Sequence, residues 1–135
     1  MTNRLFVYGT LMSKAIDDLG AEPRSQLLRE SVSLGAASMA GRLYDLGDYP
    51  GMVDTSDPAQ IVHGEIIELH APDVTFPWLD HYEGIDHEHP HLSDYERKIL
   101  GASINGRSTS AWVYIYRGIT TPEQLVASGR WLKTK

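Results

Sequence analysis

The sequence of 135 residues contains no cysteine, and this absence removes several classes of protein. A chain without thiols has no disulfide framework, no cysteine nucleophile and no thiolate ligands for a metal ion. No apolar run approaches the ~20 residues that a helix needs to cross a bilayer. The apolar segment nearest the N-terminus, Leu5 to Tyr8, is too short for a secretory signal. We therefore expect a cytoplasmic protein.

Two common catalytic signatures are missing as well. No serine lies in a GxSxG motif, which disfavours an α/β-hydrolase. The segment after the first predicted strand has neither of the glycine-rich patterns that bind phosphate groups, GxxxxGK[ST] and GxGxxG. The composition is otherwise ordinary for a globular protein, with 41% apolar and 22% charged residues. With no repeat, linker or low-complexity tract, residues 1–135 are expected to form a single domain.

Positive charge is absent from one stretch, residues 80–96, which holds all of the net charge of −6. Acidic and basic side chains balance over the rest of the chain. The same stretch contains four of the six histidines. This distribution disfavours nucleic acid and anionic membranes as partners, because both attract basic surfaces. For most of these residues a solvated acidic loop is the simplest interpretation.

The order of predicted elements favours an α+β fold. Strands are expected at 4–8, at 31–46 with breaks at Gly35 and Gly41, and at 61–69, and a turn is expected at 48–51. Short helices are expected at 23–30, from a start between 73 and 76 to a stop at Gly84, and from the N-cap Thr121 onward. Because strands dominate and helices are short, we expect a mixed or antiparallel sheet curled toward a barrel.

The last third of the chain predicts a long hairpin. Asn105-Gly106 is typical of a two-residue type I′ turn, and strand-like segments at 95–104 and 107–116 flank it. In that register, the numbers of opposed residues sum to 211. The register places three pairs on one face of the sheet: Tyr95 with Tyr116, Arg97 with Tyr114, and Ile99 with Trp112.

Glu83 is the first candidate for chemistry. On a helical wheel it falls inside an apolar arc formed by Phe76, Trp78, Leu79 and Tyr82. His81 points away from this arc, and Asp80 lies at its margin. A carboxyl group among apolar neighbours has a raised pKa, which suits a general acid or base near neutral pH. The spacing leaves open the alternative of a helix-end glutamate that turns outward.

A second candidate is the turn after the first strand, where Gly9 lets the backbone approach a ligand closely. Successive N–H groups there could form a nest for a carboxylate, and an ordinary turn with Thr10 as a helix cap is the alternative.

A third candidate is the alternating set His87, His89 and His91, which in an extended chain would face one metal ion. A mobile polar loop is the default interpretation of that set.

Four motifs in order resemble the gamma-glutamylcyclotransferase-like family, in particular the gamma-glutamylamine cyclotransferase branch and its small bacterial relatives. They are LFVYGTL at 5–11, GRLYDLGDYPG at 41–51, LDHYEG at 79–84 and YER at 95–97. The resemblance runs from residue 4 to about 117. It does not include the predicted C-terminal helix, and the His-rich segment between Gly84 and Tyr95 matches no pattern of the family.

The resemblance implies a small mixed barrel with a cavity at one end. It also implies cyclisation of a γ-glutamyl group to 5-oxoproline with release of the attached amine. Glu83 matches the catalytic glutamate, Tyr95 matches a tyrosine near the site, and the loop that holds the γ-glutamyl group matches Tyr8, Gly9, Thr10 and Leu11. Because the substrate's own amine attacks its own carbonyl, no protein nucleophile, metal or organic cofactor is required.

Three functions thus remain open from the sequence. The first is this cyclotransferase, whose partner is a small γ-glutamyl molecule. The second is a non-catalytic relative that binds a small carboxylate in the same cavity. The third is a metal-dependent hydrolase built on His87, His89 and His91. The acidic stretch at 80–96 favours a cationic leaving amine over one that carries a second carboxylate.

Overall fold

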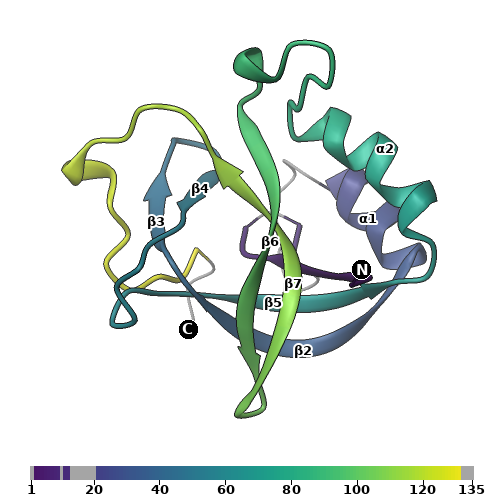
Figure 1. Ribbon diagram of the computed structural model, residues 1–135, viewed down its shortest axis with the longest axis horizontal. Coiled ribbons are helices and arrows are strands. Elements are labelled where there is room, and N and C mark those ends of the chain that lie inside the picture. The colour runs from purple at the N-terminus through teal and green to yellow at the C-terminus, as the bar shows by residue number, and fades with distance from the viewer. Residues whose placement is uncertain (1, 10, 13–20, 132–135) are drawn as a thin grey trace.

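The computed structural model describes residues 2–9, 11–12 and 21–131. Five strands form a closed barrel in the order β1-β5-β2-β6-β7 (Figure 1). Their bounds are β1 Arg4–Val7, β2 Ser31–Ala40, β5 Ile61–Leu69, β6 Tyr95–Ile104 and β7 Arg107–Tyr116. All neighbours pair antiparallel except β1 and β7, which meet in parallel at Leu5 and Trp112 and close the barrel. The expected α+β fold with a mixed, strand-dominated barrel is confirmed.

The remaining elements flank the barrel on two sides. The helices α1 (Ala21–Arg29) and α2 (Pro72–Tyr82) lie together against one side, and a two-stranded sheet of β3 (Arg42–Asp45) and β4 (Pro50–Val53) lies on the other (Figure 1). Two short 3-10 turns complete the described elements, at Pro90–Leu92 and Pro122–Gln124. No helix in the described part of the chain has the length and apolar character needed to cross a membrane.

The alternation of side chains along each strand divides the core into two clusters. One cluster includes Phe6, Met39, Val62, Ile66 and Val113, all nearly inaccessible to water. The other lies on the opposite face of the same strands, where helix residues cover it; it includes Leu5, Val7, Ile67, Leu69, Tyr95, Tyr114, Leu27, Phe76 and Leu79. The second cluster therefore fixes α2 against the barrel.

The hairpin of β6 and β7 has the register that the sequence predicts. Tyr95 pairs with Tyr116, Arg97 with Tyr114, and Ile99 with Trp112. The turn residues Asn105 and Gly106 have φ values of 51° and 73°, as a type I′ turn requires. A two-residue turn sets the register of both strands, which explains why this prediction reached single-residue accuracy.

The expected turn at 48–51 is displaced. Pro50 and Gly51 open strand β4, and the turn lies at residues 46–49, where the Leu46 N–H donates to the Tyr49 carbonyl at 3.0 Å. Gly47 supplies the positive φ of 117° that this turn needs. Proline is tolerated as the first residue of a strand, so the Pro-Gly pair here begins a strand and does not form the turn.

The expected C-terminal helix is wrong. The predicted capping box of Thr121 and Gln124 is present, with the Thr121 N–H donating to Gln124 Oε1 at 2.8 Å, but the helix ends after one 3-10 turn. The chain then pairs with the barrel region: the Val126 N–H donates to the Leu43 carbonyl, and the Gly129 carbonyl accepts the His63 N–H, both at 2.8 Å. These tertiary bonds use backbone groups that a longer helix would need.

Helix α2 begins at Pro72, slightly before the expected window, because proline is favoured at the first helical position. Within the described residues, helix α1 already includes Ala21, two residues before the expected start. The strand at 61–69 has the expected bounds. The predicted irregularity in the long strand is present at Gly35, where β2 shifts register against β5 and φ is 111°.

Candidate active site

A cavity of about 270 Å³ lies where the ends of β1 and α2 meet the β3–β4 turn and the start of β6. Aromatic and aliphatic side chains form most of its wall, and carboxyl groups enter from the end of α2 and from the loop before β6. Its lining residues are Phe6, Val7, Tyr8, Gly9, Leu11, Tyr49, Pro50, Tyr82, Glu83, Asp94, Tyr95 and Tyr114.

The end of α2 presents Glu83 to this cavity. Glu83 is the C-cap residue, and Gly84 follows with φ of 77°. The Gly84 N–H donates to the His81 carbonyl at 3.1 Å and the Ile85 N–H to the Asp80 carbonyl at 2.9 Å, the two bonds of a Schellman motif. The positive φ favours glycine at this position, and a Cβ atom would also lie 2.5 Å from Asp94 Oδ2.

The environment of Glu83 raises its proton affinity. Burial raises the pKa of the Glu83 carboxyl group from its ordinary 4.5 to about 7, and the negative charge of Asp80 contributes in the same direction. Glu83 can therefore both accept and donate a proton near neutral pH.

The helical wheel was right about Glu83 and wrong about one of its neighbours. Glu83 lines the cavity and His81 is exposed, as the spacing predicts. Tyr82 is 42% exposed, although the wheel placed it in the apolar arc. It lies at the end of the helix and borders the cavity, so its ring is only partly covered.

The predicted binding loop lies on the opposite wall, as far as the structure describes it. Tyr8, Gly9 and Leu11 line the cavity, and Thr10 lies outside the described residues. The Gly9 carbonyl accepts the Met12 N–H at 3.1 Å. A Cβ atom on Gly9 would lie 2.6 Å from the Pro50 ring, so this glycine lets the loop approach β4. The anion nest expected here stays a prediction.

Two tyrosine hydroxyl groups join the walls of the cavity. Tyr8 Oη donates to the Tyr114 carbonyl at 2.7 Å and accepts the Met52 N–H at 3.2 Å. Tyr95 Oη donates to the Pro50 carbonyl at 2.9 Å. Burial raises the pKa values of the Tyr8 and Tyr95 phenols well above the usual value for tyrosine, so both remain protonated. These tyrosines therefore make the cavity rigid, and Tyr95 ties β6 to β4.

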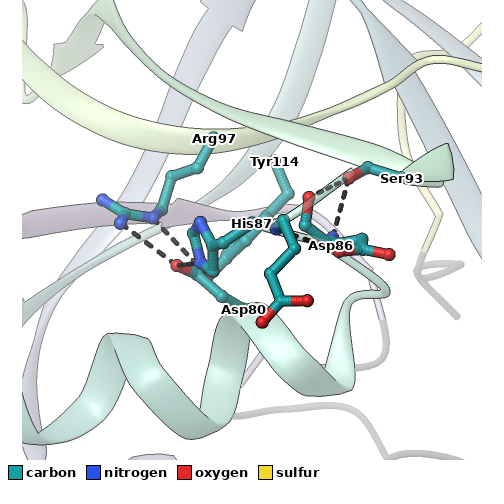
Figure 2. Close-up of polar contacts among 7 residues, drawn as sticks. Asp80, Asp86, His87, Ser93, Arg97 and Tyr114 are labelled. Atoms are coloured by element: carbon teal, nitrogen blue, oxygen red, sulfur yellow. Dashed lines mark hydrogen bonds and ion pairs between the residues drawn. The ribbon is translucent and has the colours of Figure 1, made fainter. Parts of the chain in front are cut away.

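Asp80 is a buried charged residue that the sequence did not identify as important. The wheel put it at the margin, yet it is 3% exposed and lies against the barrel. Arg97 from β6 and Tyr114 from β7 both bind its carboxylate (Figure 2). The predicted hairpin register places Arg97 opposite Tyr114. A charged residue on the covered face of the hairpin needs an acidic partner, and this was the signal that could have identified Asp80.

The histidines at 87, 89 and 91 do not form the arrangement that a metal site would need. In the residues that the structure describes, no group of three His, Asp or Glu side chains converges as metal ligands would. His87 Nε2 lies 3.2 Å from Asp80 Oδ2, and His89 lies beside Asp86. The segment turns through a 3-10 helix at Pro90–Leu92, so alternate residues do not share one face.

Comparison with protein families gives one match over most of the chain. A family model described as gamma-glutamyl cyclotransferase, AIG2-like, matches residues 5–133. The match continues through the C-terminal segment that the sequence motifs do not reach. A Citrobacter rodentium relative named gamma-glutamylcyclotransferase family protein ytfP is 30% identical over 96% of this chain and 95% of its own length. A Vibrio cholerae relative, named with gamma-glutamylcyclotransferase as a suggested activity, is 32% identical over 97% and 96%.

Solved structures support the same fold. An AIG2-like protein from Mus musculus has a TM-score of 0.70 and 21% identity, covering 96% of this chain and 87% of its own. A uropathogenic Escherichia coli-specific protein, c4763, has a TM-score of 0.69 and 18% identity, covering 97% and 93%. At these identities the likeness concerns the arrangement of the strands and helices.

Proposed function

Because this chain belongs to the gamma-glutamyl cyclotransferase, AIG2-like family, we propose that it converts the γ-glutamyl group of a small molecule to 5-oxoproline. The attached amine or amino acid is released. Family membership supports an enzyme of this general type. The reaction on a particular substrate and the residues that carry it are the content of the proposal.

The reaction is an intramolecular acyl transfer. The α-amino nitrogen of the substrate attacks its own γ-carbonyl carbon and closes a five-membered ring. One carbon–nitrogen bond forms, the bond to the departing amine breaks, and no water is consumed. The attacking nitrogen loses a proton and the departing nitrogen gains one. The protein has to hold the folded substrate and carry that proton.

Glu83 is the proposed proton carrier, and its environment is the single observation on which the proposal depends. Glu83 lines the cavity, and burial raises the pKa of its carboxyl group to about 7. As a carboxylate it accepts a proton from the substrate's neutral α-amino group as this nitrogen attacks the γ-carbonyl carbon. As a carboxylic acid it then protonates the departing amine when the tetrahedral intermediate collapses.

The other predicted residues have binding roles in this proposal. The loop of Tyr8, Gly9, Thr10 and Leu11 would hold the glutamyl head, with backbone N–H groups directed at its α-carboxylate. Tyr95 shapes the wall, since its hydroxyl hydrogen is committed to the Pro50 carbonyl. The apolar lining keeps water from the reacting atoms, which strengthens every charge interaction inside the cavity.

The test is a screen for 5-oxoproline release across γ-glutamyl amines and γ-glutamyl dipeptides. Glu83→Gln keeps the shape of the side chain but cannot carry the proton, so turnover should fall by about 10² or more. Glu88→Gln is the matched control, because it makes the same chemical change at an exposed position in the loop after α2, and it should keep full turnover.

Two results would contradict parts of the proposal. Full turnover by Glu83→Gln on a substrate that the protein cyclises would show that another group moves the proton. Ligand-induced thermal stabilisation by γ-glutamyl compounds with no 5-oxoproline from any of them would favour the non-catalytic binding function instead.

A further inference from the structure

Asp80 lies on α2 one turn before Glu83, and its carboxylate is bound from three directions. Arg97 from β6 forms a bidentate contact, with Nε 2.9 Å from Oδ1 and Nη2 3.2 Å from Oδ2. The Tyr114 hydroxyl from β7 donates to Oδ1 at 2.6 Å. His87, from the loop after the helix, places Nε2 3.2 Å from Oδ2. Figure 2 shows these side chains converging on Asp80.

The partner of Asp80 is itself held in place. The Arg97 guanidinium carbon lies 3.8 Å from the centre of the Phe76 ring and 4.4 Å from that of Trp112. One ring belongs to α2 and the other to β7, so the guanidinium group sits between helix and barrel. Stacking on two aromatic faces and a fork of two hydrogen bonds leave Arg97 little freedom.

The backbone of Asp80 takes part in the same turn that presents Glu83. Its carbonyl accepts the Ile85 N–H, the longer bond of the Schellman motif. The side chain of Asp80 thus joins the last turn of α2 to β6 and β7, and its main chain closes that turn around Glu83. A shift of Asp80 would move the Glu83 carboxyl group relative to the cavity wall.

We propose that Asp80 and Arg97 form a positioning pair, which holds the end of α2 against the barrel and places the Glu83 carboxyl group in the cavity beside the Asp80 charge. The inference rests on the proposed function, because it assigns the pair a role in proton transfer by Glu83. The proposed role of Asp80 in catalysis is indirect. Asp80 contacts Arg97 and Tyr114, and it acts on the reaction through Glu83.

The charges of the pair affect the proton affinity of Glu83 in addition to holding the helix in place. The negative charge of Asp80 raises the proton affinity of Glu83, and Arg97 neutralises much of that charge at longer range. Apolar side chains could also hold the helix against the barrel, and they would pack at lower desolvation cost than a buried ion pair.

Several other groups face Glu83 in the cavity, and they stay unchanged in the variants below. They come from the residue after β1, the β3–β4 turn, the end of α2, the loop before β6, and strands β6 and β7. These titratable side chains are Tyr8, Tyr49, Tyr82, Asp94, Tyr95 and Tyr114.

The test measures the Glu83 carboxyl group directly. Protein labelled with ¹³C at glutamate side-chain carboxyls is titrated by NMR, and the Glu83 signal is identified by its loss in Glu83→Gln. In Asp80→Asn the titration midpoint should fall by about one pH unit or more, because the negative charge near Glu83 is removed and the charge of Arg97 is no longer compensated. Asp73→Asn removes the same charge from the first turn of α2 and should leave the midpoint unchanged.

A double variant keeps the test decisive if Asp80→Asn folds poorly. Asp80→Asn with Arg97→Gln leaves no unpaired buried charge. Its midpoint should lie below that of the unmodified protein and above that of Asp80→Asn. A Glu83 midpoint that is the same in all folded variants would overturn the proposal and leave Asp80 a structural residue.

The enzymatic assay separates this inference from the proposed function. The pH at which 5-oxoproline release reaches half its maximum should move with the NMR midpoint in Asp80→Asn. If no γ-glutamyl compound yields 5-oxoproline, the proposed function fails, and the NMR midpoints still decide whether Asp80 sets the protonation of Glu83.

Discussion

A neutral isostere at position 83 should stabilise this protein, and the gain should depend on pH. Burial raises the pKa of Glu83 to about 7 in the folded state, whereas an unfolded chain has the ordinary value near 4.5. Below pH 4.5 the side chain is protonated in both states and contributes no penalty. As the pH rises through 7, the folded state has to ionise a buried carboxyl group that the unfolded state ionises freely.

The size of the effect follows from the difference between the two pKa values. Each pKa unit corresponds to about 1.4 kcal/mol, so ionised Glu83 lowers the free energy of unfolding by roughly 3 kcal/mol above pH 8. Glu83→Gln removes that penalty. The difference in unfolding free energy between variant and parent should therefore grow from near zero at pH 4.5 to the order of 3 kcal/mol at pH 8.

Urea unfolding of both proteins across this pH range measures the difference directly. The other titratable groups change the unfolding free energy of both proteins equally, so their contributions cancel. Glu88→Gln, at an exposed position, should show no such trend. If Glu83→Gln is no more stable than its parent at pH 8, the carboxyl group is not desolvated and the argument for its raised pKa is wrong. A gain in stability with a loss of turnover would be the usual trade-off of an active site.

Two further predictions concern the surroundings of Glu83. Gly84→Ala should lower the free energy of unfolding, measured in urea, by about 1–2 kcal/mol. Alanine disfavours a φ of 77°, and its Cβ would contact Asp94. The control is Gly101→Ala, whose Cβ would have no atom within 4 Å. Because Asp94 borders the cavity, γ-glutamyl-lysine should be cyclised faster than γ-glutamyl-glutamate, and Asp94→Asn should narrow that difference in kcat/KM. Faster turnover of γ-glutamyl-glutamate would reverse the second prediction.

Local patterns carried most of the successful predictions. The Asn105-Gly106 turn determined the register of ten residue pairs, because a two-residue turn leaves the flanking strands no choice of alignment. The helix stop at Gly84 and the inward direction of Glu83 also follow from short-range rules, the left-handed conformation after a helix and the period of 3.6 residues. Each of these signals lies within a few residues of the feature it predicts.

The expected C-terminal helix, which is wrong, and the alternative of a histidine metal site both rest on local patterns. The capping pattern at Thr121 is a correct local signal, but hydrogen bonds to β3 and β5 compete for the backbone beyond it. Alternation along 87–91 would bring three imidazoles together only in an extended chain, and Pro90 begins a 3-10 turn instead. In both places distant partners or local turns outweigh the pattern that a window of sequence shows.

The sequence by itself thus determined the fold class, the hairpin register and the helix that presents Glu83. Only the tertiary structure decided the environment of that glutamate: the cavity around it, and the buried Asp80 held by Arg97 and Tyr114. Those partners lie 17 and 34 positions from Asp80 along the chain. Proton affinity depends on burial and on charges nearby in space, and these arise only when the helix packs on the closed barrel.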